Sequence, residues 1–214
     1  MHKALWQERA RALAAPLVEV LARAGITPTA VTLVGLVLNV AAGVWIGLGH
    51  TLLGGVVLLV ASICDGLDGG LARRTGRVTR FGAFLDSTID RIDETVVLAG
   101  IAAYFFQRDG IAGGLWGVAV LLALGGSLIT SYTRARAEGL GLECKVGWFE
   151  RPERLAVTIL GLLLGYRALI GATAILVLFS WATVVQRIRH VQRLTASRGA
   201  EVGAGARSEL PSSP

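Results

Sequence analysis

Four aspartates at helical spacings are the residues of this sequence that point most directly to chemistry. Asp65 and Asp68 are three positions apart, and Asp86 and Asp90 are four positions apart. On a helix each pair shares one face, because residues three or four positions apart lie one above the other. A basic turn separates the two pairs, which predicts two antiparallel helices that face each other. The four carboxylates would then converge.

Converging carboxylates predict a site for divalent cations. In a membrane each would cost about 3 kcal/mol even on the lenient insertion scale, and cations would offset both this cost and the mutual repulsion. Hard oxygen ligands suit Mg²⁺ or Mn²⁺, and two such ions can clamp a pyrophosphate during group transfer. Gly66, Gly69 and Gly70 leave room for a ligand beside the backbone. Arg73 is well suited to pair with a diphosphate.

Two other interpretations fit carboxylates in an apolar region. They could form structural ion pairs with Arg73, Arg80 and Arg91. They could also mark a sodium or proton pathway, because paired intramembrane acids occur in transporters. Four acids at two helical spacings beside three glycines favour the metal site over ion pairs alone.

The composition indicates that a lipid bilayer surrounds the helices that position these aspartates. The chain of 214 residues is 53% hydrophobic and 17% charged, with a mean hydropathy of +0.62, whereas a soluble domain has about 25% charged residues. Long apolar runs separate the charges, and 28 glycines permit close helix packing in lipid. We therefore expect a single all-α membrane domain.

Six apolar segments have roughly the 20-residue length that a membrane span requires. The fifth is interrupted by Tyr166 and Arg167, where a very short turn would join it to the sixth. We place the spans near residues 29–49, 51–73, 81–106, 111–136, 153–170 and 171–193. The expected organisation is an amphipathic surface helix within 1–27, a six-helix domain over 28–195 and a disordered tail over 196–214.

The positive charges predict the orientation of the chain. The net charge is +6 and the pI is about 10.1. Arginines cluster after the second, fourth and sixth spans, whereas the opposite connections hold only His50, Arg108 and Arg167. The positive-inside rule places both termini and the aspartates at the cytoplasmic face of a multi-pass cell-membrane protein. Because the basic residues lie between apolar spans, we expect anionic lipid and phosphate as partners, and no nucleic acid.

The aspartates belong to a longer motif that resembles the signature of the CDP-alcohol phosphatidyltransferase family. That signature, D-x2-D-G-x2-A-R-x8-G-x3-D-x3-D, is matched at each fixed position by Asp65, Asp68, Gly69, Ala72, Arg73, Gly82, Asp86 and Asp90. The plan of six spans after a surface helix is also similar, over nearly residues 3–193. The resemblance implies a transferase of phospholipid biosynthesis that moves a phosphatidyl group from a CDP-activated lipid to an alcohol and releases CMP.

The resemblance also implies roles for individual residues. Asp65, Asp68 and Asp86 match ligands of two metal ions, either Mg²⁺ or Mn²⁺. Asp90 matches a residue that both contacts a metal and accepts the proton of the acceptor hydroxyl. The residues that match contacts with the donor, CDP-diacylglycerol, are Pro28, Thr29, Ala30, Val31, Gly69, Arg73 and Thr79. The first of these also fit a helix start, with Thr27 as its cap.

Three arginines at the ends of three spans suggest a phosphorylated acceptor. Residues 131–138, 150–155 and 183–187 resemble the bacterial phosphatidylinositol phosphate synthases and their archaeal relatives. This resemblance implies that Arg134, Arg154 and Arg187 hold the phosphate of inositol 1-phosphate, with Arg134 in place of a lysine. Each could instead only anchor a helix end at the cytoplasmic face. That anchoring role is what we expect of Arg136, Arg151, Arg189 and Arg193.

Other functions are distinguishable in principle from this one. The same chemistry with another acceptor, such as glycerol 3-phosphate, would yield a product without inositol. A cation or proton transporter would not release CMP in a metal-dependent reaction. A non-catalytic scaffold would have little reason to keep four acids in lipid. The family resemblance further implies a homodimer, which glycine-rich helix faces permit.

Overall fold

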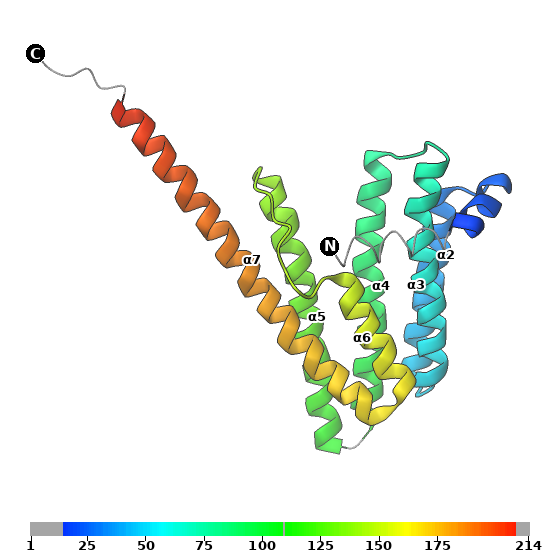
Figure 1. Cartoon of the computed structure of the whole chain (residues 1–214). Coiled ribbons are helices and arrows are strands. Elements are labelled where there is room, and N and C mark those ends of the chain that lie inside the picture. Colours follow the sequence, from blue (N-terminus) through cyan, green and yellow to red (C-terminus); the bar gives the residue numbers. More distant parts are fainter. Residues whose placement is uncertain (1–14, 109, 209–214) are drawn as a thin grey trace, which may run out of the picture.

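The computed structural model describes residues 15–108 and 110–208, and every regular element in this part of the chain is a helix. After a helical segment over residues 15–23, the chain forms six longer helices (Figure 1). These are α2 (Pro28–Gly47), α3 (Thr51–Arg74), α4 (Arg80–Phe106), α5 (Gly110–Gly139), α6 (Arg151–Leu164) and α7 (Tyr166–Ser208). The predicted all-α fold is confirmed.

The helix starts follow from local sequence. Thr27 caps α2, accepting a hydrogen bond from the backbone N–H of Ala30 at 3.2 Å, and Pro28 occupies the first turn, as expected. Thr79 caps α4 in the same way through Gly82 N–H, at 2.9 Å. A reciprocal capping box of Glu150 and Glu153 begins α6. Each cap satisfies backbone donors that have no partner within the helix.

Four helices, namely α2, α3, α5 and residues 166–196 of α7, are long and apolar enough to cross a membrane. Helices α4 and α6, which correspond to the third and fifth predicted spans, are not both long and apolar enough to be counted with them. Charged residues crowd the first half of α4, and α6 has only 14 residues, which gives a length of roughly 21 Å. The structure therefore establishes a helical, membrane-compatible protein with four candidate spans.

The boundary between the last two helices differs from the predicted ranges of 153–170 and 171–193. Helix α6 ends at Leu164, and Gly165, with φ of 93°, forms the turn into α7. Glycine adopts this left-handed conformation without the strain of a side chain, so the break falls one residue before Tyr166. Helix α7 continues to Ser208, past the predicted boundary at residue 195, and residues 209–214 lie outside the described chain.

Helix α2 is the element that positions α3 and α4. It packs closely against both, whereas the backbones of α3 and α4 do not approach each other as closely in the described chain. Close approach requires glycine, because a Cβ at Gly43 would lie 2.7 Å from the carbonyl oxygen of Val96 on α4. On the far side of α3, a Cβ at Gly55 would lie 2.9 Å from Leu162 Cβ of α6. Helix α7 packs against α5 and α6, which completes the bundle.

The helical segment over residues 15–23 is the described part of the predicted surface helix, since residues 1–14 lie outside the described chain. Val18 is buried against Leu67 and Leu71 of α3. Glu19 pairs with Arg74 at the end of α3, at 3.0 Å, and with Arg23, at 3.1 Å. The two guanidinium groups hold the pKa of the Glu19 carboxyl below its usual range. The segment therefore packs across the basic end of α3.

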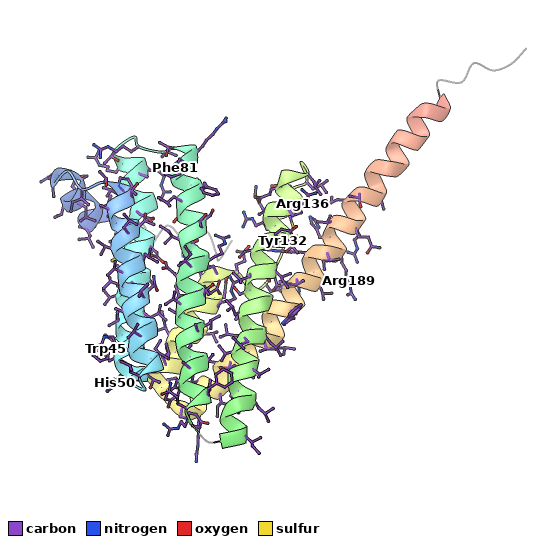
Figure 2. The ribbon with its side chains drawn as sticks, turned by 180° about the vertical axis from the view of Figure 1, so that it is seen from behind. Trp45, His50, Phe81, Tyr132, Arg136 and Arg189 are labelled. Carbon is purple, nitrogen blue, oxygen red and sulfur yellow. The ribbon has the colours of Figure 1, made fainter. Side chains whose placement is uncertain are left out.

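The two ends of the bundle differ in character. Figure 2 shows Arg136 and Arg189 towards the end of the molecule that carries Phe81, and Trp45 and His50 at the opposite end. The labelled arginines lie towards one end, a distribution typical of membrane proteins, whereas aromatic residues occur towards both ends.

Candidate active site

The four aspartates lie on the facing sides of α3 and α4, across the gap that α2 maintains. These two helices run in opposite directions from the turn that joins them, as predicted (Figure 1). A guanidinium group of α6 bridges the gap: Arg151 contacts Asp65 Oδ2 and Asp90 Oδ1, each at 2.8 Å. One residue of a third helix thus joins a carboxylate of α3 to a carboxylate of α4.

The other two aspartates have different surroundings. Asp68 is buried and accepts a hydrogen bond from the hydroxyl of Thr32 on α2, at 2.7 Å, and another from the backbone N–H of Gly69. Asp86 is exposed, yet it lies close enough to Asp68 and Asp65 to repel both electrostatically. The four acids therefore form one electrostatic cluster.

A glycine of α2 makes room for this cluster. A Cβ at Gly35 would lie 2.7 Å from Oδ1 of Asp65, closer than an uncharged carbon and an oxygen can approach without displacement. The carboxylate of Asp65 therefore occupies space that any larger residue at position 35 would fill.

The chemistry of the cluster fits a hard divalent cation, although its geometry is not that of a closed metal site. Among the described residues, no three Asp, Glu, His or Cys side chains are gathered as ligands of one ion. The guanidinium of Arg151 lies between Asp65 and Asp90 instead. The donor set nevertheless consists of mutually repelling carboxylates on two separated helices, which is the ligand type that Mg²⁺ and Mn²⁺ prefer.

Next to the aspartates is a cavity of about 220 Å³ that collects charged residues from four helices. The three arginines expected to bind an acceptor phosphate all line it: Arg134 from α5, Arg154 from α6 and Arg187 from α7. Asp90 lines it as well. In all, five arginines face three carboxylates around this cavity, so its walls are favourable for an anion.

Fixed contacts hold two of these arginines in place. Arg154, 2% exposed, forms a bidentate ion pair with Glu94 of α4 at 2.7 and 3.1 Å. Arg187, 3% exposed, donates to the carbonyl oxygens of Val146 and Thr130. Backbone and carboxylate acceptors thus orient these guanidinium groups before any ligand binds. Arg134 is more exposed and pairs with Glu138, at 2.9 Å.

The residues expected to contact the donor lie at the start of α2, in the last turns of α3 and at the cap of α4. Pro28–Val31 form the first turn of α2, one residue before the Thr32 that contacts Asp68. Gly69 leaves open space on its face of α3, where its closest neighbour is the guanidinium of Arg73. Thr79 is the cap of α4. These groups surround the same end of the gap between α3 and α4.

Sequence reasoning missed several residues of the site. Arg151 was expected only to anchor a helix end, which is wrong, because it contacts two of the four aspartates. Its position three residues before Arg154, on the same face of α6, was the available signal. Glu94, four residues after Asp90, carried a similar signal. Thr32 carried none, because its contact with Asp68 depends on how α2 packs.

Comparisons with known proteins agree with the motif. Residues 25–186 match the model of the family described as CDP-alcohol phosphatidyltransferase. The chain is 40% identical to the archaetidylinositol phosphate synthase of Methanothermobacter thermautotrophicus, over 77% of this chain and 83% of that protein. It is 35% identical to the phosphatidylinositol phosphate synthase of Cutibacterium acnes, over 86% of this chain and 92% of that protein.

Solved structures give the same result. The structure is similar to that of Mycobacterium tuberculosis phosphatidylinositol phosphate synthase with CDP-DAG bound, with a TM-score of 0.75, 35% identity and coverage of 82% of this chain and 92% of that one. A second structure of the same enzyme, in complex with manganese and citrate, gives a TM-score of 0.76 with 34% identity, and coverage of 83% and 88%.

Proposed function

Because the chain belongs to the CDP-alcohol phosphatidyltransferase family, we propose that it transfers the phosphatidyl group of CDP-diacylglycerol to a hydroxyl of inositol 1-phosphate and releases CMP. The observation that carries this proposal is the cavity in which Asp90 lies beside arginines of α5, α6 and α7. The names of the relatives support the same acceptor.

Asp65, Asp68, Asp86 and Asp90 would hold two divalent cations, with Mg²⁺ as the expected metal and Mn²⁺ as the other candidate. Such ions, when bound, neutralise a diphosphate and stabilise the oxygen that leaves with CMP. Thr32 orients the carboxylate of Asp68 through its hydrogen bond, as residues behind metal ligands commonly do. Gly35 keeps the space that Asp65 occupies.

Asp90 is the proposed general base. It lines the cavity and belongs to the aspartate cluster, so it lies between the acceptor and the donor's diphosphate. It accepts the proton of the inositol hydroxyl as that oxygen attacks the lipid-side phosphorus, and the bond from phosphorus to the CMP oxygen breaks. Positioning and electrostatic stabilisation suffice for this direct displacement.

Arg134, Arg154 and Arg187 would bind the phosphate of inositol 1-phosphate. Because Arg154 and Arg187 are already held by protein acceptors, little side-chain entropy is lost when the anion binds. Pro28–Val31, Gly69, Arg73 and Thr79 would bind the CDP part of the donor, while its acyl chains stay in lipid. The two substrates thus approach the aspartates from different sides.

The proposed setting is the cell membrane. All six helices α2–α7 would cross it or lie within it, with the short α6 and the charged α4 covered by the four apolar helices. Both termini and the active site would face the cytoplasm, which the arginines at one end of the bundle support (Figure 2). We also propose a homodimer as the working assembly.

A direct assay tests the function. Purified protein in detergent, with Mg²⁺ and CDP-diacylglycerol, should release CMP when inositol 1-phosphate is added. Inositol, which lacks the phosphate, and glycerol 3-phosphate, which lacks the ring, serve as matched acceptors. CMP release with glycerol 3-phosphate alone would refute the proposed acceptor and keep the chemistry. No CMP release with any acceptor would refute the transferase.

A further inference from the structure

Arg151 differs from the other arginines of the cavity in what holds it. Arg154 and Arg187 are fixed by Glu94 and by backbone carbonyls on the wall of the cavity. The guanidinium of Arg151 instead spans Asp65 and Asp90, at 2.8 Å from each. Its side chain is 29% exposed, against 3% for Arg154 and Arg187. Arg91 also lines the cavity, but it pairs with Asp90 alone, at 3.6 Å. Arg151 is therefore the cavity arginine that bridges two of the carboxylates proposed to bind metal.

The guanidinium of Arg151 lies between the aspartates and the cavity whose arginines would attract an anion. It lines the cavity that holds Arg134, Arg154 and Arg187, and it also lines a second, smaller pocket together with Asp65 and Glu94. Arg151 is the first residue of α6, and the capping box and Pro152 fix its backbone. Because the backbone is fixed, a movement of the guanidinium from the aspartates towards the cavity would be a rotation of the side chain.

A divalent cation on Asp65 and Asp90 competes with Arg151, because the guanidinium contacts one oxygen of each carboxylate. A cation bound to the same two carboxylates would also repel the nearby positive charge of the guanidinium. An anion in the adjoining cavity would attract the displaced group. Resting on the two-metal function proposed above, we propose that Arg151 couples the two sites: divalent cations displace it from Asp65 and Asp90, and it then binds the phosphate of the acceptor.

This arrangement makes the binding of metal and of anion mutually favourable. Without an anion, Arg151 competes with the metal, so the metal binds more weakly than the carboxylates alone would allow. With an anion in the cavity, the guanidinium has another partner, so the metal binds more tightly. The coupling must be reciprocal, and typical couplings change an affinity by about 5–150-fold. The enzyme would thereby assemble its metal centre most completely when the acceptor is present.

The test measures Mn²⁺ binding by electron paramagnetic resonance, on the full chain in detergent and without donor lipid. Sulfate serves as the tetrahedral anion, with chloride at equal ionic strength as its control. In chloride, Arg151→Gln should bind Mn²⁺ at least about fivefold more tightly than the wild type. Sulfate should strengthen Mn²⁺ binding to the wild type, and should leave that of the variant unchanged.

Two further variants complete the experiment. Arg151→Lys keeps the charge but cannot bridge two carboxylates, so its Mn²⁺ affinity in chloride should fall between those of the wild type and of Arg151→Gln. Arg136→Gln removes an exposed arginine near the end of α5, outside the cavity lining, and should change neither affinity nor coupling. Thermal unfolding in Mn²⁺ confirms that each variant is folded.

Two results separate this inference from the proposed function. If the wild type binds Mn²⁺ and Arg151→Gln binds it equally or more weakly, or keeps the sulfate effect, the coupling is refuted while the metal site stands. If neither protein binds Mn²⁺, the two-metal function itself is refuted.

Discussion

The bidentate pair of Arg154 and Glu94 allows stability and function to be separated in one experiment. Both side chains lie inside the bundle, with exposed fractions of 3% and 15%, and their two hydrogen bonds join α6 to α4. Replacing Arg154 by Met leaves the carboxylate of Glu94 buried and unpaired. Removing one partner of a buried pair destabilises a protein by about 3–5 kcal/mol. At about 2–4 °C per kcal/mol for a chain of this size, Arg154→Met should lower Tm by about 6–20 °C.

The double variant Arg154→Met with Glu94→Gln removes both charges and keeps similar volumes. Replacing a buried ion pair by neutral groups often changes stability little, so the Tm of the double variant should be close to that of the wild type. The activity of the double variant should nevertheless stay low. Loss of a charge-assisted contact with the acceptor phosphate, worth about 1.5–3 kcal/mol, should reduce kcat/KM for inositol 1-phosphate by about 10–150-fold.

Thermal unfolding in detergent and CMP release across a range of acceptor concentrations give the two readouts. If the double variant has the kcat/KM of the wild type, the charge of Arg154 does not contribute to acceptor binding. That result would refute the assignment of Arg154 to the acceptor phosphate. A double variant as unstable as the single one would show that the destabilisation does not come from an unpaired Glu94.

Three other perturbations test the aspartate cluster. Asp90→Asn should lower kcat by at least about 100-fold with Tm unchanged or raised, and full turnover would exclude Asp90 as the base. Gly35→Ala places a methyl group 2.7 Å from Asp65 Oδ1, so it should weaken Mn²⁺ binding measured by calorimetry. Gly66→Ala is the control, because its Cβ meets open space, and it should leave Mn²⁺ binding unchanged. Chelation by EDTA should abolish CMP release and added Mg²⁺ or Mn²⁺ should restore it, whereas activity that survives chelation would contradict the metal mechanism.

Much of the site was predictable because its signals are local. The spacings of Asp65 with Asp68 and of Asp86 with Asp90 follow from the helical repeat, and each pair does lie within one helix, α3 and α4 respectively. The cap at Thr27 is equally local, since a cap bonds to a backbone group three residues away. Thr79 was predicted only as a donor contact, although its cap on Gly82 follows the same local rule.

Contacts between distant helices were not predictable in the same way. The gap between α3 and α4 arises because α2 packs against both helices, which no residue between the two aspartate pairs encodes. The contact of Thr32 with Asp68 depends on this packing. Arg151 meets Asp65 across 86 positions of sequence, and a positive charge at a helix start has a simpler explanation as an anchor.

The turn at Gly165 shows why the boundary between two apolar helices is difficult to predict from the sequence. The interruption at Tyr166 and Arg167 pointed to the right place, but hydropathy does not distinguish the end of one apolar helix from the start of the next. A single glycine with φ of 93° makes the turn, so the apolar pattern continues almost without a break. The conformation of one residue, rather than any change in composition, sets the boundary.

The order of the elements along the chain divides the site between an early and a late half. The aspartates and the helix that spaces them lie within residues 28–106, whereas Arg151 and the cavity arginines Arg134, Arg154 and Arg187 come from residues 110–208. Because chains are synthesised from the N-terminus, the acidic half enters the membrane before any of these arginines exists. During biogenesis Asp90 therefore has Arg91 of its own helix as a partner, whereas Asp65 lacks its partner Arg151 until α6 arrives beside α3.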